Sequence, residues 1–360
     1  MTGVLDSTAE SIPDDHDLFT AGPMRTYLVS RGLIERSDTI TLRTLSGGVS
    51  NHTALIEVTG RGSMVIKKAR PRLDVDSDWR SDPRRALIEA RALHWLPEFL
   101  PPGNSCPLYW VDEDEMMFAG AAVPSPHRIW KDDLLSGVIE RGHFVQFAEM
   151  LGGLHVRSSR SPIALKAFED RTFFETLRID PFYRSAATAL PAASRFLTDL
   201  AERTRQVQRC LVHGDATPKN LLIHNDDIVL IDHEVIHTGD PCFDVGLALA
   251  HFISKAVHLR SQSEILAATT DFVSAYAGVV GDNADYEWGT VERQRAGEHA
   301  LGCVFARVVG KSPLPYLSEA ERVVQLDAAM TVLQASVDLE VHSVPERLLD
   351  AVERLEEQGV

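Results

Sequence analysis

Two short polar segments in the second half of the chain contain residue types that can handle a phosphate group. They read HGDATPKN over residues 213–220 and IDHE over residues 231–234. In phosphoryl transfer, a carboxylate orients the attacking hydroxyl group, and an asparagine five residues further on holds a metal ion. Asp215 and Asn220 have this spacing. We therefore expect both to act, together with His213, in a catalytic loop.

A metal site is expected at the same place. Mg²⁺ is a hard cation that takes oxygen ligands from one or two carboxylates and an amide, and Asn220 and Asp232 offer such oxygens. Apolar stretches on either side of Asn225 and Asp226 predict a β-hairpin that returns Asp232 to Asn220. His, Gly and Asp also occur in ordinary turns, so the prediction depends on the motif, the hairpin and Asp232 together.

A nucleotide site is expected in the first third of the chain. Gly47 and Gly48 lie in a turn between two strand-like stretches, where backbone N–H groups and the Ser50 hydroxyl could donate hydrogen bonds to phosphates. Lys67 ends the next apolar stretch and Glu89 lies in a helical one; such a pair serves the α and β phosphates of ATP. Each feature alone also fits a plain hairpin, an exposed strand end or a solvated helix face. Their order along the chain favours the nucleotide site.

The elements that must position these residues follow from the spacing of apolar residues. Alternation and glycine-containing turns predict three strands over residues 40–68, and helical spacing predicts a helix over residues 84–96. Prolines near residue 124 end the strand-rich part, and the remainder reads as helical except for strands between residues 209 and 236. The sequence thus predicts a bilobal α+β fold. The predicted lobes are a small strand-rich one over residues 1–122 and a larger, mostly helical one over residues 123–360.

The composition limits the classes of function. The 360 residues carry a formal net charge of −16, which argues against nucleic-acid binding because phosphate backbones attract lysine- and arginine-rich surfaces. Four cysteines without a C-x-x-C pair indicate neither a zinc site nor a disulfide framework. The acidic N-terminus lacks the apolar region of a secretory signal, and the most apolar stretch, Val245–Ile253, is too short to cross a bilayer. We expect a cytoplasmic enzyme without membrane or nucleic-acid partners; no feature specifies its oligomeric state.

The motifs resemble those of the aminoglycoside phosphotransferase and choline kinase superfamily of protein-kinase-like enzymes. Its signature is H-G-D-x-x-x-x-N, followed by I-D and by G-D-P-x-x-D, and it matches residues 213–220, 231–232 and 239–244. The resemblance extends from about Leu45 to Tyr316. It implies a protein-kinase-like fold, and it implies that Asp244 anchors the catalytic loop without contacting the substrate.

Several stretches are most similar to methylthioribose kinase. They include VIKKARPRL, HRIWKDDLLSG and EDRTFFETLRIDPFY. This resemblance implies that Glu234 can join the metal site. The chain departs from that kinase at Asn220, where the family has a small residue, and at Ala306-Arg307, where the family has an arginine pair on the sugar. Arg307 is therefore a candidate substrate contact, although an arginine on a helix surface fits equally well.

These features predict transfer of the γ-phosphoryl group of ATP, or of GTP, with Mg²⁺, to a hydroxyl group of a small molecule. The favoured acceptor is an antibiotic of the nucleoside or aminoglycoside type, which phosphorylation would inactivate. A metabolic sugar kinase of the methylthioribose kinase type and a non-catalytic nucleotide-binding module are the alternatives. Cationic aminoglycosides require an acidic pocket, to which the acidic run Asp112–Glu115 could contribute. Gly214 in place of the arginine of H-R-D, and a sequence without D-F-G or A-P-E, disfavour a protein kinase.

Overall fold

The chain forms two compact units. The computed structural model describes residues 18–45, 50–72, 81–283, 286–335 and 338–358. The first unit comprises Met1–Ala86 and Leu108–Ala122, and the second comprises Leu87–Pro107 and Val123–Val360. The helix predicted over residues 84–96, which the sequence assigns to the first lobe, therefore falls mainly in the second unit. The reason is that its Ala92 packs into the core of that unit.

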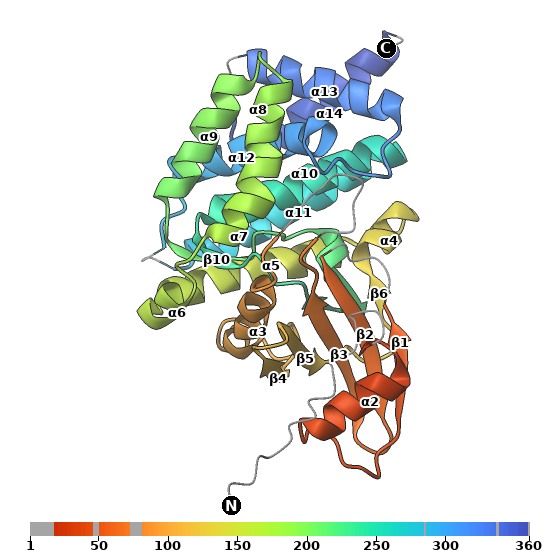
Figure 1. Ribbon diagram of the computed structural model, residues 1–360. Helices are drawn as coiled ribbons and strands as arrows, with labels where there is room; N and C mark the ends of the chain where they lie inside the picture. Colours follow the sequence, from red (N-terminus) through yellow and green to blue (C-terminus); the bar gives the residue numbers. More distant parts are fainter. Residues whose placement is uncertain (1–17, 46–49, 73–80, 284–285, 336–337, 359–360) are drawn as a thin grey trace, which may run out of the picture. The chain divides into compact units, whose positions relative to one another are not determined.

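The first unit is a five-stranded antiparallel sheet with a helix packed against it (Figure 1). The strand order is β1-β2-β3-β5-β4. The elements are α2 Ala21–Ser30, β1 Ile40–Thr44, β2 Asn51–Val58, β3 Gly62–Ala69, β4 Leu108–Asp112 and β5 Met117–Ala121. Alternate residues of β2, Ala54, Ile56 and Val58, are buried in a core shared with Met24 and Leu28 of α2. This alternation is typical of an antiparallel sheet with one covered face.

The second unit is mostly helical and contains two small sheets (Figure 1). Its helices are α3 Arg85–Trp95, η1 Leu96–Glu98, α4 Trp130–Leu135, α5 Arg141–Ser159, α6 Pro162–Ala167, α7 Thr172–Phe174, the π-helix η2 Glu175–Arg184, α8 Ser185–Ala189, α9 Ser194–Gln206, η3 Pro218–Asn220, α10 Pro241–Leu259, α11 Gln262–Gly281, α12 Thr290–Val309, α13 Glu319–Gln334 and α14 Ser343–Glu357. Its strands are β6 Arg128–Ile129, β7 Cys210–Val212, β8 Leu221–His224, β9 Asp227–Leu230 and β10 His237–Gly239. Asn225 and Asp226 join β8 to β9 with φ values of 50° and 64°, as a two-residue hairpin requires. The predicted hairpin is thus confirmed.

Helix α10 is the central element of the second core. Its residues from Pro241 to Val257 are buried, and it packs along α12 and α11. It extends beyond the apolar run seen in the sequence at both ends, and Asp240 caps its N-terminus by accepting the N–H of Cys242. By length and composition α10 is apolar enough to cross a membrane, but 89% of its apolar window is buried inside the protein. This burial is typical of a core helix.

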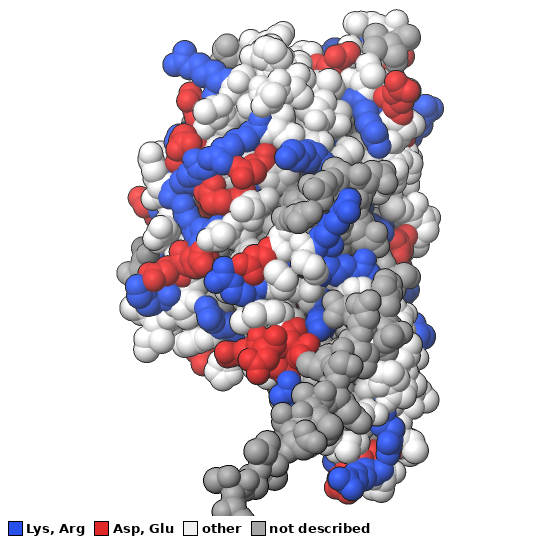
Figure 2. Space-filling view, in the orientation of Figure 1, with Lys and Arg blue, Asp and Glu red and all other residues white. Residues whose placement is uncertain are grey.

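Acidic and basic side chains intermingle on the surface. On the face shown in Figure 2, described lysines and arginines lie among aspartates and glutamates. Some form ion pairs across elements, for example Arg205 with Glu175 at 2.5 Å and Arg293 with Glu340 at 2.6 Å. Such exposed or half-exposed pairs contribute little to stability. They neutralise part of the surface charge.

Helices α10 and α12 cross closely at Gly246, which gives a test of the packing. A Cβ atom at Gly246 would lie 2.3 Å from the Cβ atom of His299. Gly246→Ala should therefore force the helices apart and lower the free energy of unfolding by about 1–3 kcal/mol. Gly278→Ala in α11 is the matched control, since none of the described residues lies within 4 Å of a Cβ atom there. It should raise that free energy by about 0.4–1 kcal/mol. Urea denaturation measures both, and equal effects would contradict the close crossing.

Candidate active site

The loop after β7 carries the first predicted motif. His213 follows β7 directly, and Pro218–Asn220 form the short helix η3 before β8 begins. Gly214 has a φ of +74°, and a Cβ atom there would lie 3.0 Å from the carbonyl oxygen of Val235. Both the left-handed backbone and the lack of space therefore require a glycine at this position.

The carboxylate of Asp244 fixes the backbone of this loop. Asp244 lies in the first turn of α10 and is fully buried. It accepts the N–H of His213 at 2.7 Å and the N–H of Gly214 at 2.8 Å, and Nε2 of His155 lies 3.3 Å from it. Burial by itself raises the pKa of Asp244, but the hydrogen bonds from His155 and Gly214 outweigh burial and hold the pKa below its usual value. An ionised carboxylate with these partners is what a loop anchor requires.

Three nitrogen donors surround the carboxylate of Asp215. Nη2 of Arg178 lies 2.9 Å from Oδ1, and Nζ of Lys219 lies 2.9 Å from Oδ2. The amide nitrogen of Asn220 donates to Oδ2 at 2.8 Å and to the carbonyl oxygen of Asp215 at 2.9 Å. Burial by itself raises the pKa of Asp215, but Arg178 and Lys219 hold it far below its usual range. Asp215 is therefore ionised at neutral pH, with its oxygens held in one defined position.

His213 shapes the loop from inside the protein. Its ring is fully buried, and its Nδ1 accepts the N–H of Asp215 at 3.2 Å. The proton then lies on Nε2, which donates to Nδ1 of His233 at 3.1 Å. Burial lowers the pKa of His213, so the ring is neutral near pH 7. The ring of His213 thus contacts the backbone of Asp215 from inside the protein, and a catalytic part for His213 stays a prediction.

The hairpin brings the predicted metal ligands Asn220 and Asp232 to neighbouring positions. The N–H of Ile231 donates to the carbonyl oxygen of Asn220 at 3.0 Å, at the open end of the β8–β9 pair. Asp232 follows at once, close enough for its charge to oppose the effect of burial on the pKa of His213. Because Asn220 uses its amide nitrogen on Asp215, the amide oxygen is the group that can serve as a ligand.

The backbone after β9 is irregular. Asp232 has a φ of +67°, which is uncommon outside glycine, and residues 231–236 form no strand. Strand alternation would place Asp232 and Glu234, which are two residues apart, on the same face, but alternation does not apply here because the segment is not a strand. Glu234 is 8% exposed, and Asp232 is partly buried. Both carboxylates are thus compatible with one metal site.

Lys67 and Glu89 fall in different units. Lys67 lies on β3 of the first unit, opposite Thr53 of β2. Its neighbour Lys68, which strand alternation sends to the other face, forms an ion pair with Glu115 at 2.8 Å. Glu89 lies on α3 in the second unit and is 2% exposed. The pairing of Lys67 with Glu89 stays a prediction.

Ser50 lies directly before β2, where the expected phosphate loop ends. It is 6% exposed. Its carbonyl oxygen accepts the N–H of Arg70 at 2.9 Å and a hydrogen bond from the buried guanidinium of Arg85. These contacts fix the backbone at Ser50. Gly47 and Gly48 lie outside the described residues.

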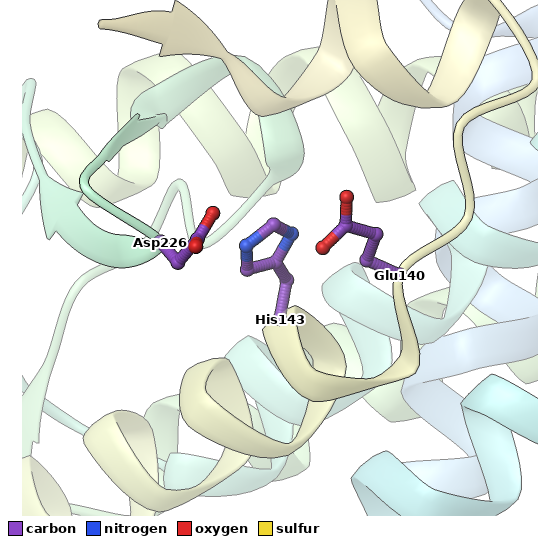
Figure 3. A group of neighbouring side chains, drawn as sticks. All are labelled: Glu140, His143 and Asp226. Atoms are coloured by element: carbon purple, nitrogen blue, oxygen red, sulfur yellow. The ribbon is translucent and has the colours of Figure 1, made fainter.

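A separate group of metal-ligating side chains lies at the turn of the hairpin (Figure 3). The ligand atoms of Glu140, His143 and Asp226 lie within 4.8 Å of one another. Asp226 is in the turn, whereas Asn220 and Asp232 flank the open end, roughly 13 Å away along four-residue strands. Both carboxylates of the group are exposed, as acidic surface groups commonly are. This group is distinct from the predicted metal site.

Arg307 is partly buried and lies in the surroundings of Asp215. Its Cζ atom is 5.6 Å from the ring centroid of Phe182, and its Nη1 donates to the carbonyl oxygen of Ser312 at 2.6 Å. Arg178 contacts the same Phe182 ring at 5.7 Å. Burial lowers the pKa of Arg307, and the charge of Asp215 opposes that effect. Arg307 is therefore not a plain surface arginine.

Three side chains of the site have no counterpart among the sequence predictions: Arg178, Lys219 and His155. Lys219 lies four residues after Asp215 inside the motif, and this spacing could have identified it. Arg178 lies on the π-helix η2, whose wide turns give no regular spacing. The stretch contains other charged residues as well, so the sequence does not single out Arg178. His155 reads as one more member of the buried stripe of α5.

The chain matches a known protein family over most of its length. The match is to the phosphotransferase enzyme family and covers residues 41–276. None of the curated protein sequences matches the chain. The family match includes the catalytic loop, the hairpin and α10.

Solved structures of several kinases are similar to this chain. Amicoumacin kinase hAmiN in complex with AMP-PNP, Ca²⁺ and Ami has 12% identity and a TM-score of 0.57, over 92% of this chain and 100% of that chain. The GDP complex of wild-type aminoglycoside 2′-phosphotransferase-IIIa has 12% identity and a TM-score of 0.50, over 92% and 98%. Choline kinase from Cryptosporidium parvum Iowa II has 13% identity and a TM-score of 0.49, over 96% and 97%.

The comparisons establish the class of the protein. At such low identities the likeness to solved structures concerns the fold, which is a kinase-like α+β fold with a strand-rich and a helical part. The resemblance to methylthioribose kinase stays a prediction. The family match spans well over half of the sequence and contains both motifs. The chain is therefore an enzyme that belongs to the phosphotransferase enzyme family.

Proposed function

We propose that the chain transfers the γ-phosphoryl group of ATP or GTP to a hydroxyl group of a small molecule, with Mg²⁺ held by Asn220, Asp232 and Glu234. The observation that carries the proposal is the buried, ionised carboxylate of Asp215, which is hydrogen-bonded to Asn220 at the open end of the hairpin. We also propose a cytoplasmic location, where nucleoside triphosphates are available.

Asp215 would orient the acceptor hydroxyl group. The hydroxyl oxygen forms a bond to the γ-phosphorus, the bond between that phosphorus and the β–γ bridging oxygen breaks, and the nucleoside diphosphate leaves. The hydroxyl proton passes to an oxygen of Asp215. Because the pKa of Asp215 is so low, the carboxylate is a weak base, and it takes the proton only as the new phosphorus–oxygen bond forms. Its main contribution is therefore orientation.

The donor set at the hairpin fits Mg²⁺. This hard cation prefers oxygen ligands, and the amide oxygen of Asn220 joins the carboxylates of Asp232 and Glu234. When bound, the metal would neutralise charge on the phosphate oxygens. The solved amicoumacin kinase contains AMP-PNP and Ca²⁺, which supports the use of a nucleotide with a divalent cation.

The first unit would hold the phosphates of the nucleotide. Lys67 would place a positive charge at the α and β phosphates, with Glu89 orienting it. Backbone N–H groups at Gly47 and Gly48 and the Ser50 hydroxyl would donate hydrogen bonds to phosphate oxygens. The two arginine donors that hold the Ser50 carbonyl oxygen support this assignment, because they fix one end of the loop.

An antibiotic of the nucleoside type is favoured over an aminoglycoside as the acceptor, with inactivation as the outcome. The charged side chains that contact Asp215, Arg178 and Lys219, are basic, and they would repel a polycation. Of the acidic run Asp112–Glu115, the two end residues already form ion pairs within the first unit, which leaves fewer carboxylates for a cationic acceptor.

A sugar kinase of the methylthioribose kinase type is the second candidate. Arg178 and Arg307 both contact the ring of Phe182, so two guanidinium groups meet here although Ala306 removes one arginine of the family's pair. Nucleotide consumption with nucleoside antibiotics, pentoses and aminoglycosides, with the product located by NMR, separates the candidates. If no acceptor class supports consumption and nucleotide does not bind, the proposal is wrong.

The role of Asp215 can be tested by removing its charge. Asp215→Asn should lower kcat by about 10²–10⁴-fold, whereas nucleotide affinity should hardly change because the interaction matters chiefly in the transition state. Steady-state kinetics and nucleotide titration measure the two effects. Asp180→Asn is the control, an exposed carboxylate of η2 paired with Arg184, and it should behave as wild type. Loss of nucleotide affinity in Asp215→Asn would argue against the assigned role.

Arg178 should control the protonation range of Asp215. Arg178→Met removes a cation that depresses the pKa of Asp215, so this pKa should rise. Since the carboxylate must be ionised to accept the hydroxyl proton, the acidic limb of kcat against pH should move to higher pH in the variant. Wild type should stay active further into acid. Arg184→Met, on the same helix, is the control, and an unmoved limb in Arg178→Met would contradict the coupling.

The metal ligands can be ranked by substitution. Asp232→Asn should abolish metal-dependent turnover and weaken Mn²⁺ binding by more than about tenfold, since even outer partners of a metal contribute 10–100-fold. Glu234→Gln should have a smaller effect. Mn²⁺ binding is measured by EPR, with Glu140→Gln from the group in Figure 3 as the control. Unchanged Mn²⁺ binding in Asp232→Asn would exclude the proposed site.

A further inference from the structure

Helix α10 buries a lysine without an acidic partner. Lys255 is 1% exposed, and among the described residues no hydrogen-bond partner reaches its Nζ atom. Burial lowers the pKa of Lys255 to about 7, and the charged groups that add to the shift, Arg307 and Lys131, are both cations. A buried ammonium without a counter-charge opposes folding. The protein thus retains Lys255 at the expense of its own stability.

Two further donors beside Lys255 also lack a partner. Within the described part of the chain, Nε of Arg307 and the hydroxyl group of Tyr316 are buried without a hydrogen bond. Nζ of Lys255 lies 5.2 Å from the ring centroid of Tyr316. Burial raises the pKa of Tyr316, and Arg307 is close enough to oppose that effect. We call these three residues the basic cluster; an ammonium, a guanidinium N–H and a phenol O–H are together the donors that suit an oxyanion.

The basic cluster lies next to the carboxylate proposed to orient the hydroxyl group. Its member Arg307 shares the Phe182 ring with Arg178, and Arg178 binds Asp215. His251 precedes Lys255 by one turn of α10. Burial lowers the pKa of His251; the cluster lowers it further, and Asp215 raises it. The charges of the basic cluster and of Asp215 thus both act on His251, so the two lie near each other. A small molecule whose hydroxyl group lies at Asp215 can therefore place a second group at the basic cluster.

We propose that the basic cluster binds an anionic group of the acceptor, a carboxylate or a phosphate. This inference depends on the proposed phosphoryl transfer and defines the charge of its acceptor, a hydroxylated small molecule that carries a negative group apart from the reacting hydroxyl. The bound oxyanion supplies the counter-charge that the described residues do not provide to Lys255. Neutral nucleosides and sugars lack this group, whereas their phosphorylated or carboxylated derivatives possess it.

Stability and anion binding test the cluster without turnover. Lys255→Met should raise the midpoint of thermal unfolding in anion-free buffer, because a buried, uncompensated cation is removed. Inorganic phosphate and acetate, titrated at constant ionic strength, should stabilise wild type, and their apparent Kd should be at least about tenfold weaker in Lys255→Met. Lys311→Met, at an exposed position, is the matched control and should bind both anions as wild type does.

A second pair of variants identifies where the anion binds. Tyr316→Phe removes only a hydroxyl group and should weaken binding of phosphate and acetate by about threefold or more. If Lys255→Met does not fold, Tyr316→Phe alone shows whether the anion binds at the basic cluster. Lys67→Met should leave this binding unchanged. If anion binding persists in Tyr316→Phe and Lys255→Met but disappears in Lys67→Met, the anion lies at the nucleotide phosphates, and the proposal is overturned.

Matched acceptors test the consequence for turnover. Adenosine with its 5′-monophosphate, ribose with its 5-phosphate, and glucose with glucuronate differ within each pair by one anionic group. Wild type should phosphorylate the anionic member of an accepted pair with kcat/KM at least about tenfold higher, and Lys255→Met should lose the preference. Equal kcat/KM values, or a preference kept in Lys255→Met, overturn the proposal. If no pair is phosphorylated, the proposed transfer loses support, while the anion titrations still decide on the cluster.

Discussion

The geometry of the site depends on a charge buried at the start of α10. A fully enclosed carboxylate is tolerated only where donors satisfy it, and Asp244 obtains two of them from the backbone of His213 and Gly214. The first turn of α10 therefore fixes the backbone of the loop. The position of Asp215, one residue further on, follows from this arrangement, and so does its contact with Arg178.

The sequence predicts the parts of the site that are local in the chain. The five-residue spacing from Asp215 to Asn220 and the turn residues of the hairpin lie within one short segment, so pattern alone places them side by side. Arg178 reaches Asp215 from a distant π-helix, and helical periodicity gives no hint of it. The isolation of Lys255 is likewise a result of tertiary packing: in the sequence it reads as an ordinary break in an apolar helix. The same holds for helix α3, which the order of the chain assigns to the first lobe. Its apolar face packs into the core of the second unit instead.

The overall charge of the chain does not describe the direct ion-pair partners of Asp215, which are basic. The net charge of −16 belongs largely to a surface on which water and salt weaken each interaction. Arg178 and Lys219 act at hydrogen-bond distance on one buried group, where charges interact more strongly. The negative net charge would attract a cationic acceptor to the surface. This attraction does not specify the charges that contact Asp215.

Helix α10 carries Asp244 in its first turn and Lys255 near its other end, about 16 Å further along the axis. A buried helix is rigid, so α10 fixes the distance between the loop anchor Asp244 and the buried lysine Lys255. Because Asp244 holds the loop that carries Asp215, only an acceptor of matching length could contact Asp215 and Lys255 at once. Inserting or deleting one residue between Asp244 and Lys255 would turn Lys255 by about 100° around the helix axis. The position of Lys255 relative to Asp244 would then change, while the sequence of the catalytic loop stayed the same.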